Sequence, residues 1–141
     1  MRIDTMRRGL AAAALVALTS FAALAADSPA GVRMDYDQPL PNVPGKSLRV
    51  VIVDYAPGGS SPAHTHAKSA FIYARVLKGS IRSAVNGGPV KVYREGDAFQ
   101  ENPGDHHSVS ENASRTESAR LMAVFVVDTK DTVLTTPGAL P

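Results

Sequence analysis

The feature that most constrains the fold is a series of short β-rich runs separated by glycine-containing turns. The first run, residues 48–55, is rich in valine and isoleucine and is too short for a helix. Similar runs follow at 70–77, 80–85, 90–93, 97–101, 107–110 and 119–127. Asn86-Gly87, between two of these runs, is the strongest hairpin signal. Short strands at even spacing, with no apolar segment at helical period, predict an all-β antiparallel sandwich or closed barrel.

The first 25 residues have the pattern of a secretory signal peptide. Three arginines within the first eight residues precede an apolar, alanine-rich run over 9–24. Small residues at the end of this run predict cleavage after Ala25, or one residue later. The run is shorter than the roughly 20 apolar residues of a membrane-spanning helix, which favours export over anchoring. We therefore expect a periplasmic or secreted protein that has no membrane association after cleavage.

The charge of the chain excludes an electrostatic partner such as nucleic acid. The leader carries three arginines and one aspartate, which accounts for the whole formal charge of +2. The remaining basic and acidic residues balance and are interspersed, so they form no basic patch. The chain contains no cysteine, which excludes disulfides and thiolate metal ligands. The part that follows the leader, about 115 residues, is long enough for one core and too short for two.

Composition shifts divide the chain into four parts. Residues 1–25 are the leader, and residues 26–46 carry four prolines and show no strand or helix period, so we predict an irregular arm. Residues 47–128 hold the β-rich runs and are expected to form the barrel. Residues 129–141 are a polar, Pro- and Gly-bearing tail, expected to pack across a barrel edge or to fray.

The four histidines of the chain occupy only two places, His64-Thr65-His66 and His106-His107. Prolines and glycines before His64 exclude a helix, so the backbone here should be extended. Residues two apart in a strand project from the same face, which lets both imidazoles of an H-x-H pair reach one point. This spacing is typical of a metal-chelating pair.

The second cluster follows a Pro-Gly turn that joins two extended runs. If this turn pairs Glu101 opposite His107, both side chains lie on one face about 5 Å apart at Cβ. His106 then points the other way, although a one-residue slip would exchange the roles of His106 and His107. Three imidazoles and a carboxylate suit one divalent ion of Fe, Mn, Ni, Cu or Zn rather than Ca or Mg.

Two segments resemble the motifs of the cupin superfamily. The segment 59–66, a glycine followed by a short spacer and H-x-H, is similar to the opening of the first motif, which in the family ends on a glycine, here Gly79. The segment 96–107 resembles the second motif and assigns its histidine to His107. The resemblance implies a double-stranded β-helix (jelly-roll) barrel and a metal held by His64, His66 and His107.

The chain departs from the family pattern at the glutamate of the first motif. That glutamate is expected near residues 70–72, but no carboxylate occurs from 67 to 78. Our hypothesis is that Glu101 replaces it, either as a ligand or as an acceptor for a histidine N–H. The alternative, given equal weight, is that Glu101 caps the turn or pairs with an arginine. His106 is kept as the next metal candidate.

The resemblance implies a range of functions rather than one reaction. Cupins include dioxygenases, isomerases and decarboxylases, so a metal-dependent enzyme acting on a small molecule is the first expectation. A non-catalytic periplasmic cupin that binds or senses a small ligand or a metal is the alternative, and a vestigial site is a weaker third. Homodimer formation is a further expectation from the family. The aromatic residues considered as lining of the pocket, or alternatively as core, are Phe71, Tyr73 and Phe99.

Overall fold

The computed structural model describes residues 30–138, so the predicted leader lies outside the described residues. All regular structure in this range is β-strand, and no helix in it is long and apolar enough to cross a membrane. The strands are β1 Gly31–Pro39, β2 Lys46–Tyr55, β3 Ser60–Ser61, β4 His64–His66, β5 Phe71–Lys78, β6 Ser80–Val85, β7 Lys91–Arg94, β8 Ala98–Glu101, β9 His106–Asn112, β10 Ala119–Asp128 and β11 Thr135–Pro137.

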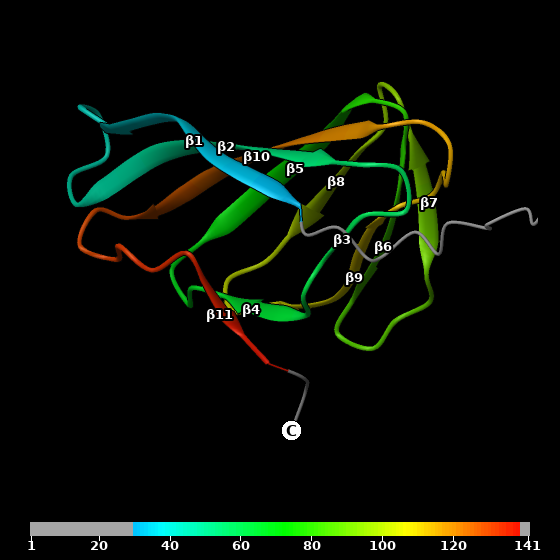
Figure 1. Ribbon diagram of the computed structural model, residues 1–141. Helices are drawn as coiled ribbons and strands as arrows, with labels where there is room; N and C mark the ends of the chain where they lie inside the picture. The colour runs from blue at the N-terminus through cyan, green and yellow to red at the C-terminus, as the bar shows by residue number, and fades with distance from the viewer. Residues whose placement is uncertain (1–29, 139–141) are drawn as a thin grey trace, which may run out of the picture.

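The strands form two antiparallel sheets that face each other (Figure 1). One sheet has the order β1-β2-β10-β5-β8. The other has the order β11-β4-β9-β6-β7, with β3 paired to β9. Several neighbours, such as β2 and β10, are far apart in sequence, which is typical of a jelly roll rather than a meander. The prediction of an all-β jelly-roll barrel is confirmed, and a strand occurs at each of the seven β-rich runs.

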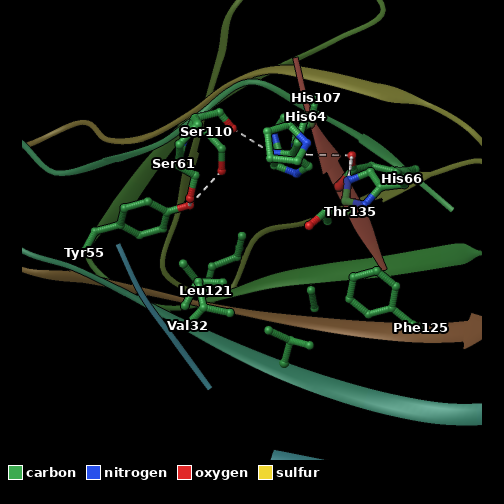
Figure 2. Close-up of a pocket in the computed structure, with 16 residues that line it drawn as sticks. Val32, Tyr55, Ser61, His64, His66, His107, Ser110, Leu121, Phe125 and Thr135 are labelled. Atoms are coloured by element: carbon green, nitrogen blue, oxygen red, sulfur yellow. Dashed lines mark hydrogen bonds and ion pairs between the residues drawn. The ribbon is translucent and has the colours of Figure 1, made fainter. Parts of the chain in front are cut away.

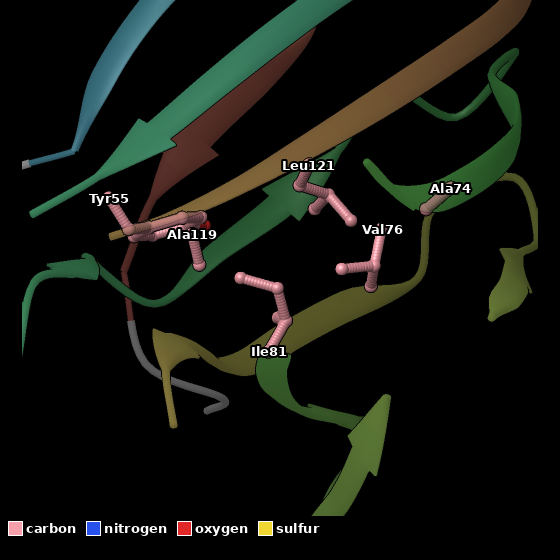
Figure 3. Packing of buried hydrophobic residues seen from close by; sticks show 6 residues of the cluster. All are labelled: Tyr55, Ala74, Val76, Ile81, Ala119 and Leu121. Carbon is pink, nitrogen blue, oxygen red and sulfur yellow. The ribbon is translucent and has the colours of Figure 1, made fainter. Parts of the chain in front are cut away.

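Alternation along the strands builds the core between the sheets. In β5, Ile72, Ala74 and Val76 are buried, whereas the residues between them face outward. This pattern of period two is expected of a strand with one solvated face. Figure 3 shows one core cluster, in which side chains of β2, β5, β6 and β10 meet: Tyr55, Ala74, Val76, Ile81, Ala119 and Leu121. A second core cluster consists of Val51, Ala70, Ile72, Phe125 and Val127, and members of both clusters line the cavity described below.

The prediction of an irregular arm over residues 26–46 is wrong for its central part. Residues 31–39 form β1, which pairs with β2 and has one register shift, between Met34 and Tyr36. Every residue of β1 is exposed, so the strand has no buried alternation by which its sequence could reveal it. Backbone pairing to β2, rather than burial, makes this segment extended.

Gly79 joins β5 to β6 as a single residue, and its geometry requires a glycine. Its φ is +71°, and an added Cβ would lie 2.8 Å from the carbonyl oxygen of Ser118 and 3.2 Å from the Cα of Ala119. Both contacts are to backbone, which cannot move aside cheaply. We expect Gly79→Ala to lower the free energy of unfolding by about 2 kcal/mol, because left-handed strain and a steric clash add together.

The matched control for Gly79 is Gly45, which has a φ of +79° but nothing within 4 Å of an added Cβ. Gly45→Ala should therefore cost only the conformational strain, about 1 kcal/mol. Urea denaturation of the two variants measures the difference. Equal losses would show that the close approach of the Ser118 carbonyl does not matter.

Candidate metal centre

Three histidines meet at one end of the barrel because two neighbouring strands carry them. His64 and His66 are the first and last residues of β4, and His107 lies in β9 directly opposite His64 in the register. Extended backbone in β4 puts both of its imidazoles on the same face, as the H-x-H spacing predicts. The ring centroids of His64 and His66 are 4.8 Å apart, and those of His64 and His107 are 5.3 Å apart.

The nitrogen atoms of these rings converge. One ring nitrogen from each of His64, His66 and His107 lies within 4.8 Å of the other two. His66 and His107 are buried, and His64 is half-buried at the edge. Such a set of imidazoles could hold a metal ion, and its chemistry suits a transition metal rather than calcium or magnesium.

Hydrogen bonds orient two of the three rings. Nδ1–H of His64 donates to the carbonyl oxygen of Pro62 at 2.8 Å, which leaves Nε2 free. Nε2 of His107 is hydrogen-bonded to the hydroxyl of Ser83 at 2.8 Å, and its Nδ1 lies on the side of Glu101. A partner on one ring nitrogen fixes the orientation and tautomer of a metal-binding imidazole. Pro62 and Ser83 hold this role here.

Glu101 reaches the histidines by a different route from the one expected. The prediction that Glu101 and His107 pair across a hairpin is wrong, because the Pro-Gly turn carries the chain from one sheet to the other. Glu101 instead lies opposite Ile72 in the β5–β8 pair, and His107 lies opposite His64 and Val85. The carboxylate therefore faces the imidazoles across the barrel rather than beside them in one sheet.

The distances between Glu101 and the imidazoles match donors around one ion. Oε2 of Glu101 is 2.8 Å from Nε2 of His66 and 3.3 Å from Nδ1 of His107. Donor atoms about 2.0–2.2 Å from a common ion are themselves about 2.8–3.6 Å apart in octahedral or tetrahedral geometry. Although Oε2 of Glu101 and Nε2 of His66 are close, they do not form a hydrogen bond with each other. Neither atom has any hydrogen-bond partner within residues 30–138.

Buried polar atoms of His66 and Glu101 without hydrogen bonds indicate that the site fits a cation. Both ring nitrogens of His66 and Oε2 of Glu101 are buried and have no hydrogen-bond partner among the described residues. Burying a carboxylate oxygen without a partner costs several kcal/mol of folding free energy. Burying an unpaired neutral nitrogen costs less. A divalent ion among these atoms would remove that cost. The donors present therefore fit a metal.

Burial adjusts the protonation of the site in the direction that metal binding needs. Burial lowers the pKa of His107 to about 4, against the opposing effect of Glu101, and burial also lowers the pKa of His64. For Glu101, burial would raise the pKa, but contact with His66 and the attraction that a protonated His107 would exert outweigh burial and leave the pKa below its usual value. At neutral pH the site thus holds neutral His64 and His107 rings and an ionised carboxylate, the forms that bind metals.

These pKa directions predict that acid destabilises the metal-free protein. Between pH 6.5 and about 4 the unfolded chain binds a proton at His107 that the folded chain does not bind, so the free energy of unfolding falls as pH falls. His107 alone would account for a loss on the order of 3 kcal/mol over this window. Protonation of Glu101 would extend the loss below its ordinary pKa of 4.5.

The test is urea denaturation at pH 7, 5.5 and 4 after removal of metal with a chelator. In the variant His107→Gln, which cannot titrate, the fall in stability between pH 7 and pH 4 should be clearly smaller. An equal fall in both proteins would contradict the assignment of this effect to His107.

The four side chains form the floor of a cavity of about 200 Å³. Its other walls are mostly apolar, and Figure 2 shows Val32, Leu121 and Phe125 facing the imidazoles. The exposed residues at its rim include Thr135 and Pro137 of β11. Among residues 30–138, neither lysine nor arginine lines the cavity, so its charge is set by Glu101 and by whatever cation the site holds. The volume suits a ligand about the size of a benzene ring or slightly larger.

His106 lies outside this group of donors. Its Nδ1 is 3.1 Å from the hydroxyl of Thr65, and its backbone N–H donates to the side-chain oxygen of Asn86. The alternation of β9 turns it away from the cavity, as expected. His106 is therefore a buried residue of the sheet and not one of the converging imidazoles.

The aromatic residues expected at the pocket are elsewhere. Phe71 and Tyr73 are about 40% exposed on the outer face of β5, because Ile72 and Ala74 take the inward positions. Phe99 packs on Tyr93, with ring centroids 4.6 Å apart, and edge-on against His107 at 6.1 Å, but it does not line the cavity of the histidines. The interpretation of these three as lining of that cavity is corrected: within residues 30–138, the phenylalanine that lines it is Phe125 of β10, which is buried.

Sequence reasoning missed the polar residues at the side of the cavity. Tyr55, Ser61 and Ser110 line it and are hydrogen-bonded to one another. Tyr55 is the last residue of an apolar strand, so its sequence context indicates a core residue. Isolated serines such as Ser61 and Ser110 give no sequence signal of a binding site. Only their positions on three strands bring them together, so no local signal could have identified them.

Comparison with known proteins agrees with this architecture. A family model described as a cupin domain matches residues 51–125, more than half of the chain. No curated protein matches the chain. A structure from Klebsiella pneumoniae, described as an uncharacterized conserved protein with a double-stranded β-helix domain, is 16% identical with a TM-score of 0.63, and the match covers 82% of this chain and 89% of that one.

Two further structures are similar. A RmlC-like cupin family protein from Methanocaldococcus jannaschii is 13% identical with a TM-score of 0.58, and the match covers 76% of this chain and 87% of that one. An oxalate oxidase is 27% identical with a TM-score of 0.51, over 64% of this chain but only 45% of that one. Because the Klebsiella pneumoniae and Methanocaldococcus jannaschii structures are only 16% and 13% identical to this chain, their similarity shows the fold alone. With the family model and the double-stranded β-helix both matching, the chain belongs to the cupin family.

Proposed function

We propose that this protein is an exported, metal-dependent cupin enzyme of the dioxygenase or isomerase type that acts on a small molecule. One observation carries the proposal: His64, His66, His107 and Glu101 converge at the floor of an apolar cavity, with buried donor atoms that have no hydrogen-bond partner among the described residues. Four protein ligands leave open positions on an ion that prefers five or six. Those positions would face the cavity.

The side chains of the site would each have a defined task. His64, His66 and His107 would bind one ion of Fe, Mn, Ni, Cu or Zn, and Glu101 would supply the single negative charge. The chemistry that a bound divalent metal supplies is polarisation of an oxygen or one-electron redox exchange. Pro62 and Ser83 would keep the rings in place, and the apolar walls would keep bulk water away from the reacting atoms.

The charge of the site favours a monoanionic substrate. A divalent ion together with Glu101 has a net charge of +1, and no lysine or arginine of the described residues lines the cavity to pair with a second anionic group. A carboxylate, enolate or catecholate that binds by one anionic oxygen would neutralise the site. A small dianion such as oxalate would leave one charge unpaired in apolar surroundings, which is unfavourable.

The experiment begins with the metal-to-protein ratio of the mature chain purified from its native compartment. We expect about one transition-metal ion per chain, and oxygen uptake when catechol-like or thiol compounds are added to the loaded protein. A stoichiometric metal without turnover of any compound would instead favour the non-catalytic binding cupin. Absence of any bound metal, with no uptake of added Fe, Mn, Ni, Cu or Zn, would refute the proposal.

The non-catalytic alternative is favoured by one feature of the chain. The glutamate that the first cupin motif would carry is absent from 67–78, so the ligand set departs from that of the family. Export and homodimer formation remain predictions. The mass of the mature N-terminus and light scattering of the purified protein would test them.

A further inference from the structure

A second polar group lies at the side of the cavity, formed by three hydroxyls. The hydroxyl of Tyr55 is 2.7 Å from that of Ser110 and 3.0 Å from that of Ser61. Tyr55 and Ser110 are buried, and all three residues line the same cavity as the imidazoles. Figure 2 shows this hydroxyl cluster, defined as Tyr55, Ser61 and Ser110, beside the histidines, with apolar side chains on the facing side of the cavity.

A β-bulge in β9 places this cluster in the cavity. Ala84 of β6 pairs with Val109, but the next residue, Val85, pairs with His107, so Ser108 is an extra residue in β9. Without the bulge, His107 and Ser110, which are three positions apart, would face opposite sides of the sheet. With it, both side chains are buried on the inner face. Their Cα atoms are then about 10 Å apart along the strand at most.

The cluster has a hydrogen-bond donor to spare. Three hydroxyl groups carry three protons, and the two contacts between them use only two. No other hydrogen bond from the Ser61 or Ser110 hydroxyl occurs within residues 30–138. Burial raises the pKa of Tyr55, against the effect of its bonds to Ser110 and Ser61, so the phenol keeps its proton at neutral pH. One O–H of the cluster can therefore point at a ligand in the cavity.

We propose that the hydroxyl cluster is a specificity subsite that binds a polar oxygen at the far end of the substrate. The substrate class is then a short, bifunctional monoacid: one anionic oxygen at the imidazoles, an apolar middle against Val53 and Leu121, and a hydroxyl or carbonyl oxygen at Tyr55. This inference rests on the proposed function, because it takes the imidazole end as the anion-binding end.

A series of hydroxy acids of increasing chain length tests the proposed subsite directly. The probes are 4-hydroxybutanoate, 5-hydroxypentanoate and 6-hydroxyhexanoate, each paired with the alkanoate in which a methyl group replaces the terminal hydroxyl. Isothermal titration calorimetry with the Zn(II)-loaded full-length mature protein gives an affinity for each. At one chain length we expect the hydroxy acid to bind about tenfold more tightly than its methyl partner, the effect of one hydrogen bond in a buried site.

Variants assign that preference to the cluster. In Tyr55→Phe, which removes the hydroxyl that links the two serines and is placed at the substrate oxygen, the hydroxyl-to-methyl affinity ratio should fall to within about twofold of one. Ser108→Ala is the control, because the Ser108 hydroxyl bonds to the carbonyl of Ala84 and does not line the cavity. This variant should keep the tenfold ratio. Thermal unfolding of both variants checks that each is folded.

The outcomes separate this inference from the proposed function. Equal affinities within every pair, in a protein that binds Zn(II) and the alkanoates, would overturn the subsite and leave the metal site standing. A ratio that persists in Tyr55→Phe would also overturn it. A protein that retains no Zn(II) would overturn the proposed function and this inference with it.

Discussion

Replacing His66 with alanine is expected to lower the affinity for a divalent metal about 1000-fold. Structural sites of four ligands bind zinc with about 10–16 kcal/mol, so one ligand accounts for roughly 3–4 kcal/mol, or two to three orders of magnitude. His66 is expected at the upper end because it is 6% exposed and neither of its ring nitrogens has a hydrogen-bond partner among the described residues. Competition with a chelator of known affinity, using Zn(II) or Co(II), measures the loss.

His106→Gln is the matched control for His66→Ala. His106 is also buried, at 3% exposed, but its ring contacts Thr65 rather than the converging donors. Its replacement should change metal affinity by less than about threefold while costing some stability, since a buried hydrogen bond contributes about 1 kcal/mol. If His106→Gln released the metal as His66→Ala does, His106 would be a ligand, and the exchange of His106 and His107 considered from the sequence would be correct.

The fold was readable from the sequence wherever a strand has one buried face. The run at 70–77 shows this: its alternation of outward and inward residues appears as β5, shifted by one residue. The strands that escaped prediction have no such alternation. β1 is exposed along its whole length, and β3 and β11 contain two or three residues, too few to show a period.

The site was partly readable for a similar reason. The H-x-H spacing alone places His64 and His66 on one face of extended chain, which the structure bears out. The approach of Glu101 to His107 was expected from a hairpin that does not exist. Local pattern shows that a turn is present but not whether it returns the chain to the same sheet or to the facing one. The hydroxyl cluster depends on the bulge at Ser108, and no residue type signals that bulge in the sequence.

Glu101→Gln is the second substitution with a large expected effect, about 100-fold on metal affinity. Glutamine keeps the size of the side chain and one carbonyl oxygen, but it removes the negative charge from a site that is buried and contains no other acidic group. In surroundings of low polarity, loss of that charge weakens binding of a dication far more than it would in water. Oε2 lies 2.8 Å from Nε2 of His66 and 3.3 Å from Nδ1 of His107, so the negative charge would be in direct contact with an ion bound by these rings.

The alternative role of Glu101, as an acceptor that only orients His66, predicts a smaller loss. A partner behind a ligand is worth about 10–100-fold in affinity, and glutamine would retain part of its hydrogen bonding, so the loss would stay below about tenfold. The visible spectrum of the Co(II) form separates the two roles, because only removal of a directly bound carboxylate changes the ligand field. Glu111→Gln is the matched control. Glu111 lies in β9, the strand that carries His107, but its carboxylate is paired with Arg82 on the surface, at 3.1 Å. Unchanged spectrum and affinity in both variants would exclude Glu101 as a ligand and leave a site of three imidazoles.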